Sequence, residues 1–227
     1  MIVVNLKTYS EVTLGSQAVN LARIAETVAA EQNIPIILCV QATDIYKVSQ
    51  AVSLPVFAQH IDPFPPGKYT GFTSGLAVKE NGAKGVMINH SEHRIGMENV
   101  KKCLEVAKQE GLQTLVCVET AQEAQEVDTY QPDMIALEDP VLIGGSESIV
   151  HNPSGKQKVE EFVNLKLHAK PLVGAGVKDA QDVITSLHLG AAGVLLASGV
   201  ALASNPKAVL TNLCKGFSQK ENIFQVS

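Results

Sequence analysis

Two carboxylates and a proline end an uninterrupted apolar run in the chain, Met134-Ile135-Ala136-Leu137-Glu138-Asp139-Pro140. A short apolar run closed by a breaker is typical of a strand that is buried on both faces. Pro140 ends the run because proline has no N–H to give to a sheet. Glu138 is therefore predicted at the carboxyl end of a buried strand, where parallel α/β folds carry their chemistry. A strand end capped by a solvent-facing charge would explain this stretch alone equally well.

Polar side chains also follow several of the other strand patterns. They are Asn5 and Lys7, then Gln59, His60 and Asp62, then Asn89, His90, Ser91 and Glu92, and finally Glu119. Glycine-rich turns, Gly174-Ala175-Gly176 and Ala197-Ser198-Gly199, follow the last two strand patterns. Each of these alone is more often a surface charge, a structural side chain or a simple turn. Together they would face one mouth if the strands close into a barrel.

These residue types suit the removal of a proton from carbon next to a carbonyl group. A carboxylate can take the proton, and an imidazole opposite it can polarise the carbonyl oxygen. The N–H groups of the glycine-rich turns and of a short helix beginning near Ala197 can hold a phosphate, and a lysine would add positive charge. The predicted substrate class is a small phosphorylated ketone or aldehyde.

Strand and helix patterns alternate along the chain. The expected strands cover residues 2–6, 35–40, 55–59, 83–88, 112–118, 133–137, 169–173 and 191–196. The expected helices cover residues 16–30, 43–51, 73–81, 97–110, 120–130, 154–165, 179–189 and 206–216. Eight such units require parallel pairing and predict an α/β fold, a closed (β/α)8 barrel, as a single domain over residues 1–217 with a polar tail at 218–227. An open doubly wound sheet is the alternative, but no Gly-x-Gly-x-x-Gly follows the first strand.

Composition argues against several classes of protein. The 227 residues have a net charge of −5 and no Lys/Arg run, so no nucleic-acid partner is expected. No apolar stretch reaches the length of about 20 residues that spans a bilayer, and no signal peptide follows Met1. The cysteines form no Cys-x-x-Cys pair, and Cys39 and Cys117 lie in apolar strand patterns, which favours a reducing cytoplasm. No metal is expected, because His90, Glu92 and His93 lack the other ligands of a zinc site.

Several ordered motifs are more specific than any one of them. They are Asn5-Leu6-Lys7, Asn89-His90-Ser91-Glu92, Ala136-Leu137-Glu138-Asp139-Pro140 with Ile143-Gly144, Gly174-Ala175-Gly176 and Leu195-Leu196-Ala197-Ser198-Gly199. In this order, from Val3 to about Gly216, the chain resembles the triosephosphate isomerase family and especially its archaeal branch. The resemblance implies a cofactor-free enzyme of glycolysis and gluconeogenesis. It would interconvert D-glyceraldehyde 3-phosphate and dihydroxyacetone phosphate through an enediolate.

The resemblance also assigns roles to residues. Glu138 would be the catalytic base, His90 the electrophile, and Glu92 a support for Lys7 and for the proton relay. The substrate would be bound by Asn5, Lys7, Ile143, Gly144, Gly176, Ala197 and Ser198, mostly through the main chain at the phosphate. The segment Gly67-Lys68-Tyr69-Thr70-Gly71 resembles the loop with which the family docks into a neighbouring subunit. A homodimer or homotetramer with Thr70 at the interface is therefore expected.

Two other classes remain open at this point. One is a different phosphate-binding barrel, such as a synthase or an aldolase, although no strand pattern carries a clear Schiff-base lysine. The other is a non-catalytic barrel that binds a phosphate ligand and has lost turnover through an altered lid. That segment does depart from the family, which usually has Gly-Thr-Gly where this chain has Gly144-Gly145-Ser146-Glu147. Asp139 also takes the place of one of two prolines that archaeal relatives often carry.

The altered lid generates a first prediction. A glycine pair loses more conformational entropy on ordering, so substrate binding should be weaker and the enediolate should escape more often as methylglyoxal. Gly145→Thr combined with Ser146→Gly should lower KM and reduce the methylglyoxal fraction in steady-state assays. Glu147→Ala should lower KM mainly at low salt, because salt screens a charge near the phosphate. An unchanged KM and by-product fraction in the rebuilt segment would show that the lid is not the weak point.

Overall fold

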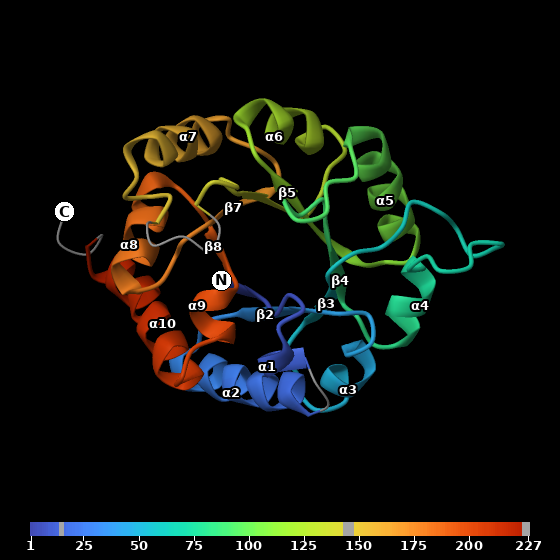
Figure 1. The fold of residues 1–227 in the computed structure, drawn as a ribbon. Coiled ribbons are helices and arrows are strands. Elements are labelled where there is room, and N and C mark those ends of the chain that lie inside the picture. Colours follow the sequence, from blue (N-terminus) through green and yellow to red (C-terminus); the bar gives the residue numbers. More distant parts are fainter. Residues whose placement is uncertain (14–15, 143–147, 224–227) are drawn as a thin grey trace.

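A computed structural model describes residues 1–13, 16–142 and 148–223 of the chain. Eight parallel strands form a closed barrel in which each strand pairs with its neighbours in sequence and β8 pairs with β1 (Figure 1). The strands are β1 Ile2–Asn5, β2 Ile36–Val40, β3 Val56–Ala58, β4 Gly85–Ile88, β5 Gln113–Val118, β6 Met134–Leu137, β7 Lys170–Gly174 and β8 Gly193–Leu196. The predicted single-domain barrel is confirmed, and the open doubly wound sheet is wrong.

Helices surround the barrel (Figure 1). They are α1 Ser10–Thr13, α2 Gln17–Gln32, α3 Ile45–Ser49, α4 Gly75–Glu80, α5 Met97–Gln109, α6 Ala121–Asp128, α7 Pro153–Asn164, α8 Ala180–Leu189, α9 Ser198–Ala201 and α10 Pro206–Ile223. The single turn α1 was not predicted, and α10 continues past its predicted end at Gly216. The division of the chain into a barrel domain and a polar tail stays a prediction.

The continuous apolar strand patterns follow from burial on two sides. Alternate strand residues form an inner cluster that includes Val3, Phe57, Leu115 and Leu172. Their neighbours along the strands join a larger cluster that includes the buried faces of the helices. Because every strand lies between these two apolar layers, its sequence shows no polar alternation. The barrel interior is therefore packed, and its functional groups lie at the strand ends.

Side-chain caps determine where several helices begin, and hence how long the preceding loops are. Thr120, Asn152 and Asp179 accept hydrogen bonds from backbone N–H groups three residues later, at donor–acceptor distances of 3.0 to 3.1 Å. Each oxygen satisfies an N–H group that has no partner within the helix. The cap at Asn152 ends the long connection between β6 and α7, which carries Glu138 at its other end.

Asp128 joins the end of α6 to the chain that leads into β7. Its carboxylate accepts hydrogen bonds from the N–H groups of Ala169 at 2.9 Å and His168 at 3.0 Å, and it lies 2.9 Å from the imidazole Nδ1 of His168. Burial alone would raise the pKa of Asp128, but these backbone and imidazole contacts together lower it below its ordinary value. The ionised carboxylate therefore stabilises the folded state.

Asp128→Asn should lower the unfolding temperature at neutral pH, because a lowered pKa in the folded state contributes stability above the unfolded pKa. That contribution is lost as the pH falls from about 4 through the folded pKa. The difference in Tm between the two proteins, measured by thermal denaturation, should accordingly shrink in this acid range. Glu126→Gln, on the exposed side of the same helix, should change Tm little. An equal difference for Asp128→Asn at pH 3 and pH 7 would contradict the assignment.

Candidate active site

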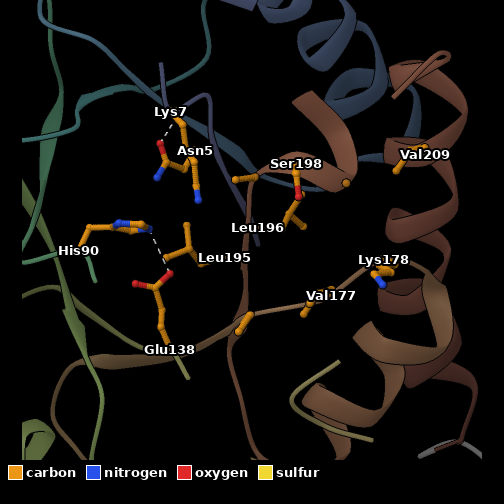
Figure 2. Close-up of a pocket in the computed structure, with 14 residues that line it drawn as sticks. Asn5, Lys7, His90, Glu138, Val177, Lys178, Leu195, Leu196, Ser198 and Val209 are labelled. Atoms are coloured by element: carbon orange, nitrogen blue, oxygen red, sulfur yellow. Dashed lines mark hydrogen bonds and ion pairs between the residues drawn. The ribbon is translucent and has the colours of Figure 1, made fainter. Parts of the chain in front are cut away.

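One cavity of about 290 Å³ lies at the carboxyl-terminal mouth of the barrel (Figure 2). It brings together most of the described residues that the sequence predicted: Asn5, Lys7, His90, Glu138, Gly176, Ala197 and Ser198. Glu92 does not line the cavity but contacts Lys7 beside it. Ile143 and Gly144, the predicted lid contacts, lie outside the described residues. Strand ends that are far apart in the sequence therefore meet around one space.

Glu138 follows the last residue of β6 and is held by its N–H, which donates to the carbonyl oxygen of Val118 at 2.9 Å. The residue is 4% exposed, and its Oε1 lies 3.3 Å from Nε2 of His90. Its Oε2 is buried and has no hydrogen-bond partner within the part of the chain that the structure describes. A buried carboxylate oxygen without a partner is costly. That oxygen can accept a proton from a bound molecule.

Gly174 makes room for this carboxylate on the neighbouring strand. A Cβ at position 174 would lie 3.2 Å from Cγ of Glu138 and 3.2 Å from the carbonyl oxygen of Leu195. Both distances are tighter than ordinary van der Waals contact. A side chain at the end of β7 would therefore require Glu138 or the backbone of Leu195 to shift by a few tenths of an ångström.

His90 lies opposite Glu138 and is almost completely buried (Figure 2). Its Nδ1 accepts a hydrogen bond from the backbone N–H of Glu92 at 3.2 Å. A ring nitrogen that accepts an N–H carries no proton, so the neutral imidazole has its proton on Nε2. The Nε2–H group faces the cavity and the carboxylate of Glu138. It can donate a hydrogen bond to an oxygen that develops negative charge there.

Lys7 is held in place by its own backbone and by an ion pair. Its φ of 49° is in the left-handed region, and its N–H donates to Oδ1 of Asn5 at 2.9 Å. Gln59 donates from Nε2 to the same Asn5 oxygen and to the carbonyl oxygen of Lys7, both at 3.0 Å. The lysine side chain is 11% exposed, and its Nζ lies 2.5 Å from Oε1 of Glu92. A fixed positive charge therefore stands at the cavity edge.

The opposite end of the cavity is built from backbone. Ala175 and Gly176, with φ of 79° and 73°, turn the chain after β7, and the helix α9 begins at Ser198 directly after β8. Ala197 precedes that helix, and its carbonyl oxygen accepts from the N–H groups of Val200 and Ala201. The N–H groups at the start of a helix have no partners within it, so they suit an anion such as a phosphate.

The structure adds residues that the sequence did not indicate. Val177 and Lys178 line the cavity directly after the glycine-rich turn, and Val209 reaches it from α10. Lys178 could have been predicted as a cavity residue, because it closely follows the glycine-rich turn that was predicted to bind phosphate. Nothing local marks Val209, because its place depends on how the last helix packs against the barrel. The phosphate end thus has an apolar wall and a second lysine at its rim.

Two buried thiols near Glu138, those of Cys39 and Cys117, are held in the protonated form. Cys39 and Cys117 belong to the buried inner cluster, as predicted. Burial, followed by the negative charge of Glu138, raises the pKa of both thiols far above the ordinary value, so they stay protonated.

In the described ranges, no three His, Cys, Asp or Glu side chains are grouped as metal ligands would be. Within those same ranges, no helix combines the length and apolar composition needed to cross a membrane.

Comparisons with known proteins agree with this geometry. A family model described as triosephosphate isomerase matches residues 1–216. The triosephosphate isomerase of Methanosarcina acetivorans is 38% identical over 218 residues, which cover 94% of this chain and 97% of that protein. That of Methanocaldococcus jannaschii is 39% identical over 217 residues, covering 95% and 99%.

A solved structure has the same barrel fold as this chain. The crystal structure of triosephosphate isomerase from Bartonella henselae superposes with a TM-score of 0.73 at 21% identity, covering 96% of this chain and 98% of that one. The likeness in structure supports the barrel, and the sequence matches identify the family. This chain belongs to the triosephosphate isomerase family.

Proposed function

We propose that this chain interconverts D-glyceraldehyde 3-phosphate and dihydroxyacetone phosphate by moving one proton between adjacent carbons. The observation that carries the proposal is the contact between the buried Glu138 carboxylate and Nε2 of His90 at the wall of one cavity, where the two atoms lie 3.3 Å apart. A carbon acid next to a carbonyl needs a base on one side and a hydrogen-bond donor at the oxygen. The two side chains supply one of each.

Glu138 acts as the base in this proposal. Its unpartnered Oε2 removes the proton from the carbon next to the carbonyl group. The same carboxylic acid then returns the proton to the neighbouring carbon. At the same time Nε2 of His90 gives its proton to the former carbonyl oxygen and takes the proton of the neighbouring hydroxyl oxygen, so that aldose becomes ketose and both side chains return to their starting states. Exclusion of water favours this transfer, because it keeps the proton on the carboxyl group from exchanging with solvent before it is returned.

His90 and Lys7 stabilise the enediolate. The Nε2–H of His90 donates to the oxygen on which negative charge develops, and the ammonium of Lys7 offsets the charge of the whole intermediate. Glu92 holds the lysine through the 2.5 Å ion pair and fixes the imidazole through its backbone N–H. Asn5 keeps the turn at Lys7 in shape. None of these steps requires a cofactor or a metal.

The phosphate group would be bound at the backbone end of the cavity, by the N–H groups at Gly176 and around Ala197 and Ser198. Ile143 and Gly144 would add contacts from the segment after Glu138. A dianion held at a fixed distance from the base brings the two reacting carbons to Glu138 and His90. These phosphate contacts therefore position the substrate as well as bind it.

An aldolase of the Schiff-base type is not favoured. Among the strands in the described part of the chain, β7 alone carries a lysine, Lys170, which is exposed at the end of the strand away from the cavity. A non-catalytic phosphate sensor would have no use for a buried carboxylate oxygen left without a partner. We place the reaction in glycolysis and gluconeogenesis. We place the protein in the cytoplasm, because its four cysteines are buried free thiols, as is usual in a reducing compartment.

Glu138→Gln should lower kcat by about three orders of magnitude, because the amide cannot take a proton from carbon. Inhibition by inorganic phosphate should change little, since the phosphate end of the cavity is untouched. Glu138→Asp should cost roughly a hundredfold, because the carboxylate moves back by about 1 Å. Glu119→Gln is the matched control, a strand-end carboxylate that does not line the cavity. Near-normal turnover of Glu138→Gln in a coupled isomerisation assay would refute the assignment.

We further propose that the chain forms a homo-oligomer, at least a dimer, through the loop between β3 and α4. Figure 1 shows this loop projecting from the barrel. Phe64 stacks on Tyr69 with ring centroids 4.5 Å apart, and Phe72 packs edge-on against Phe64 at 5.2 Å. Tyr69 and Phe72 are 41% and 53% exposed. A preshaped, exposed aromatic cluster around Thr70 favours contact with a second copy.

The ends of this loop are tied together, because Asp62 and Thr73 exchange backbone and side-chain hydrogen bonds of 2.9 and 2.6 Å. A combined Tyr69→Asp and Phe72→Asp variant should therefore keep the barrel folded but sediment as a monomer. Tyr46→Asp is the control, since Tyr46 is also exposed but lies on α3 outside the loop. A natural chain that already sediments as a fully active monomer would overturn this proposal.

A further inference from the structure

Asp139, the residue after the proposed base, makes two contacts through its buried side chain and a third through its backbone. Its Oδ2 lies 2.6 Å from Nζ of Lys158 on α7, and its Oδ1 accepts the N–H of Val141 at 3.1 Å. Its carbonyl oxygen accepts the N–H of Leu142 at 3.0 Å. The carboxylate is 6% exposed, whereas the lysine side chain is 44% exposed. The buried carboxylate is therefore paired with a lysine that lies 19 residues further along the chain, on α7.

The position of this ion pair allows it to influence the direction in which the Glu138 side chain points. Glu138 is anchored on its amino side by its N–H bond to Val118 in the barrel. On its carboxyl side the strand has ended, and the next chain direction is set by the turn from Asp139 to Leu142. Side chains at neighbouring extended positions point to opposite sides, so Asp139 faces α7 while Glu138 faces the cavity. A shift of Asp139 would therefore turn Glu138 about its own backbone.

We propose that the Asp139–Lys158 ion pair is a positioning device for the base, a role that rests on the proposed function. The pair fixes the turn after Glu138 to α7, and the turn fixes the direction of the Glu138 side chain. The effect on catalysis is steep because a displacement of about 1 Å at the reacting atoms costs roughly a hundredfold. The phosphate contacts proposed at Gly176, Ala197 and Ser198 are built on β7, β8 and α9 and are not reached by this pair.

The test is a double-mutant cycle. Asp139→Asn keeps an oxygen that can accept the N–H of Val141 but removes the charge, and Lys158→Met removes the other partner while keeping its length. Each should lower kcat about tenfold, a larger change than in inhibition by inorganic phosphate, because the contacts proposed at Gly176, Ala197 and Ser198 stay in place. The double variant should also lose about tenfold in kcat, because both changes remove the same interaction. The control is Lys156→Met, which removes an exposed pair with Glu160 on the same helix and should leave kcat unchanged.

A second readout does not depend on catalysis. Hydrogen exchange at the amides of Val141 and Leu142 should accelerate in Asp139→Asn and in Lys158→Met but not in Lys156→Met, because the turn loses its anchor. If the natural chain lacks isomerase activity, the proposed function fails and the exchange rates still decide whether the pair holds the turn. Unchanged exchange overturns the inference. It is also overturned by unchanged kcat in both single variants, or by losses that multiply in the double variant.

Discussion

A buried carboxylate facing a neutral imidazole is the arrangement on which the rest of this structure depends. Glu138 has one oxygen 3.3 Å from His90 and another with no partner among the described residues. A carboxylate buried this deeply keeps its direction only where the surrounding elements are rigid. The closed barrel, with apolar layers inside and outside its strands, provides that rigidity.

Neighbouring residues restrict the position and the protonation of Glu138, His90 and the nearby Lys7. Gly174 leaves space for the carboxylate, and the N–H of Glu92 determines which nitrogen of His90 carries the proton. Gln59 fixes the turn from which Lys7 reaches the cavity. These contacts come from residues at the strand ends or within a few residues after them, so they stay close to the barrel. A site assembled from distant parts of the sequence is thereby held on one rigid framework.

The sequence predicted the barrel and most of the described site for a common physical reason. Strands buried on both faces are continuously apolar, and in a parallel barrel their carboxyl ends must converge, so polar residues at those ends were sound candidates. What it could not predict depends on packing between distant elements. The approach of Lys158 to Asp139, the reach of Val209 from α10 and the space left at Gly174 leave no local pattern. The tautomer of His90 likewise follows from one backbone hydrogen bond, which appears only once the loop after β4 is folded.

The central claim is that His90 stands neutral, with its proton on Nε2, toward the Glu138 carboxylate. Nitrogen-15 NMR of the histidine ring at pH 7, assigned by comparison with a His90→Gln variant, tests this most directly. The account predicts an unprotonated Nδ1 and a protonated Nε2, because the N–H of Glu92 already occupies Nδ1. A ring protonated on both nitrogens, or on Nδ1 alone, would contradict it, since the group facing the substrate oxygen would then not be the neutral donor described.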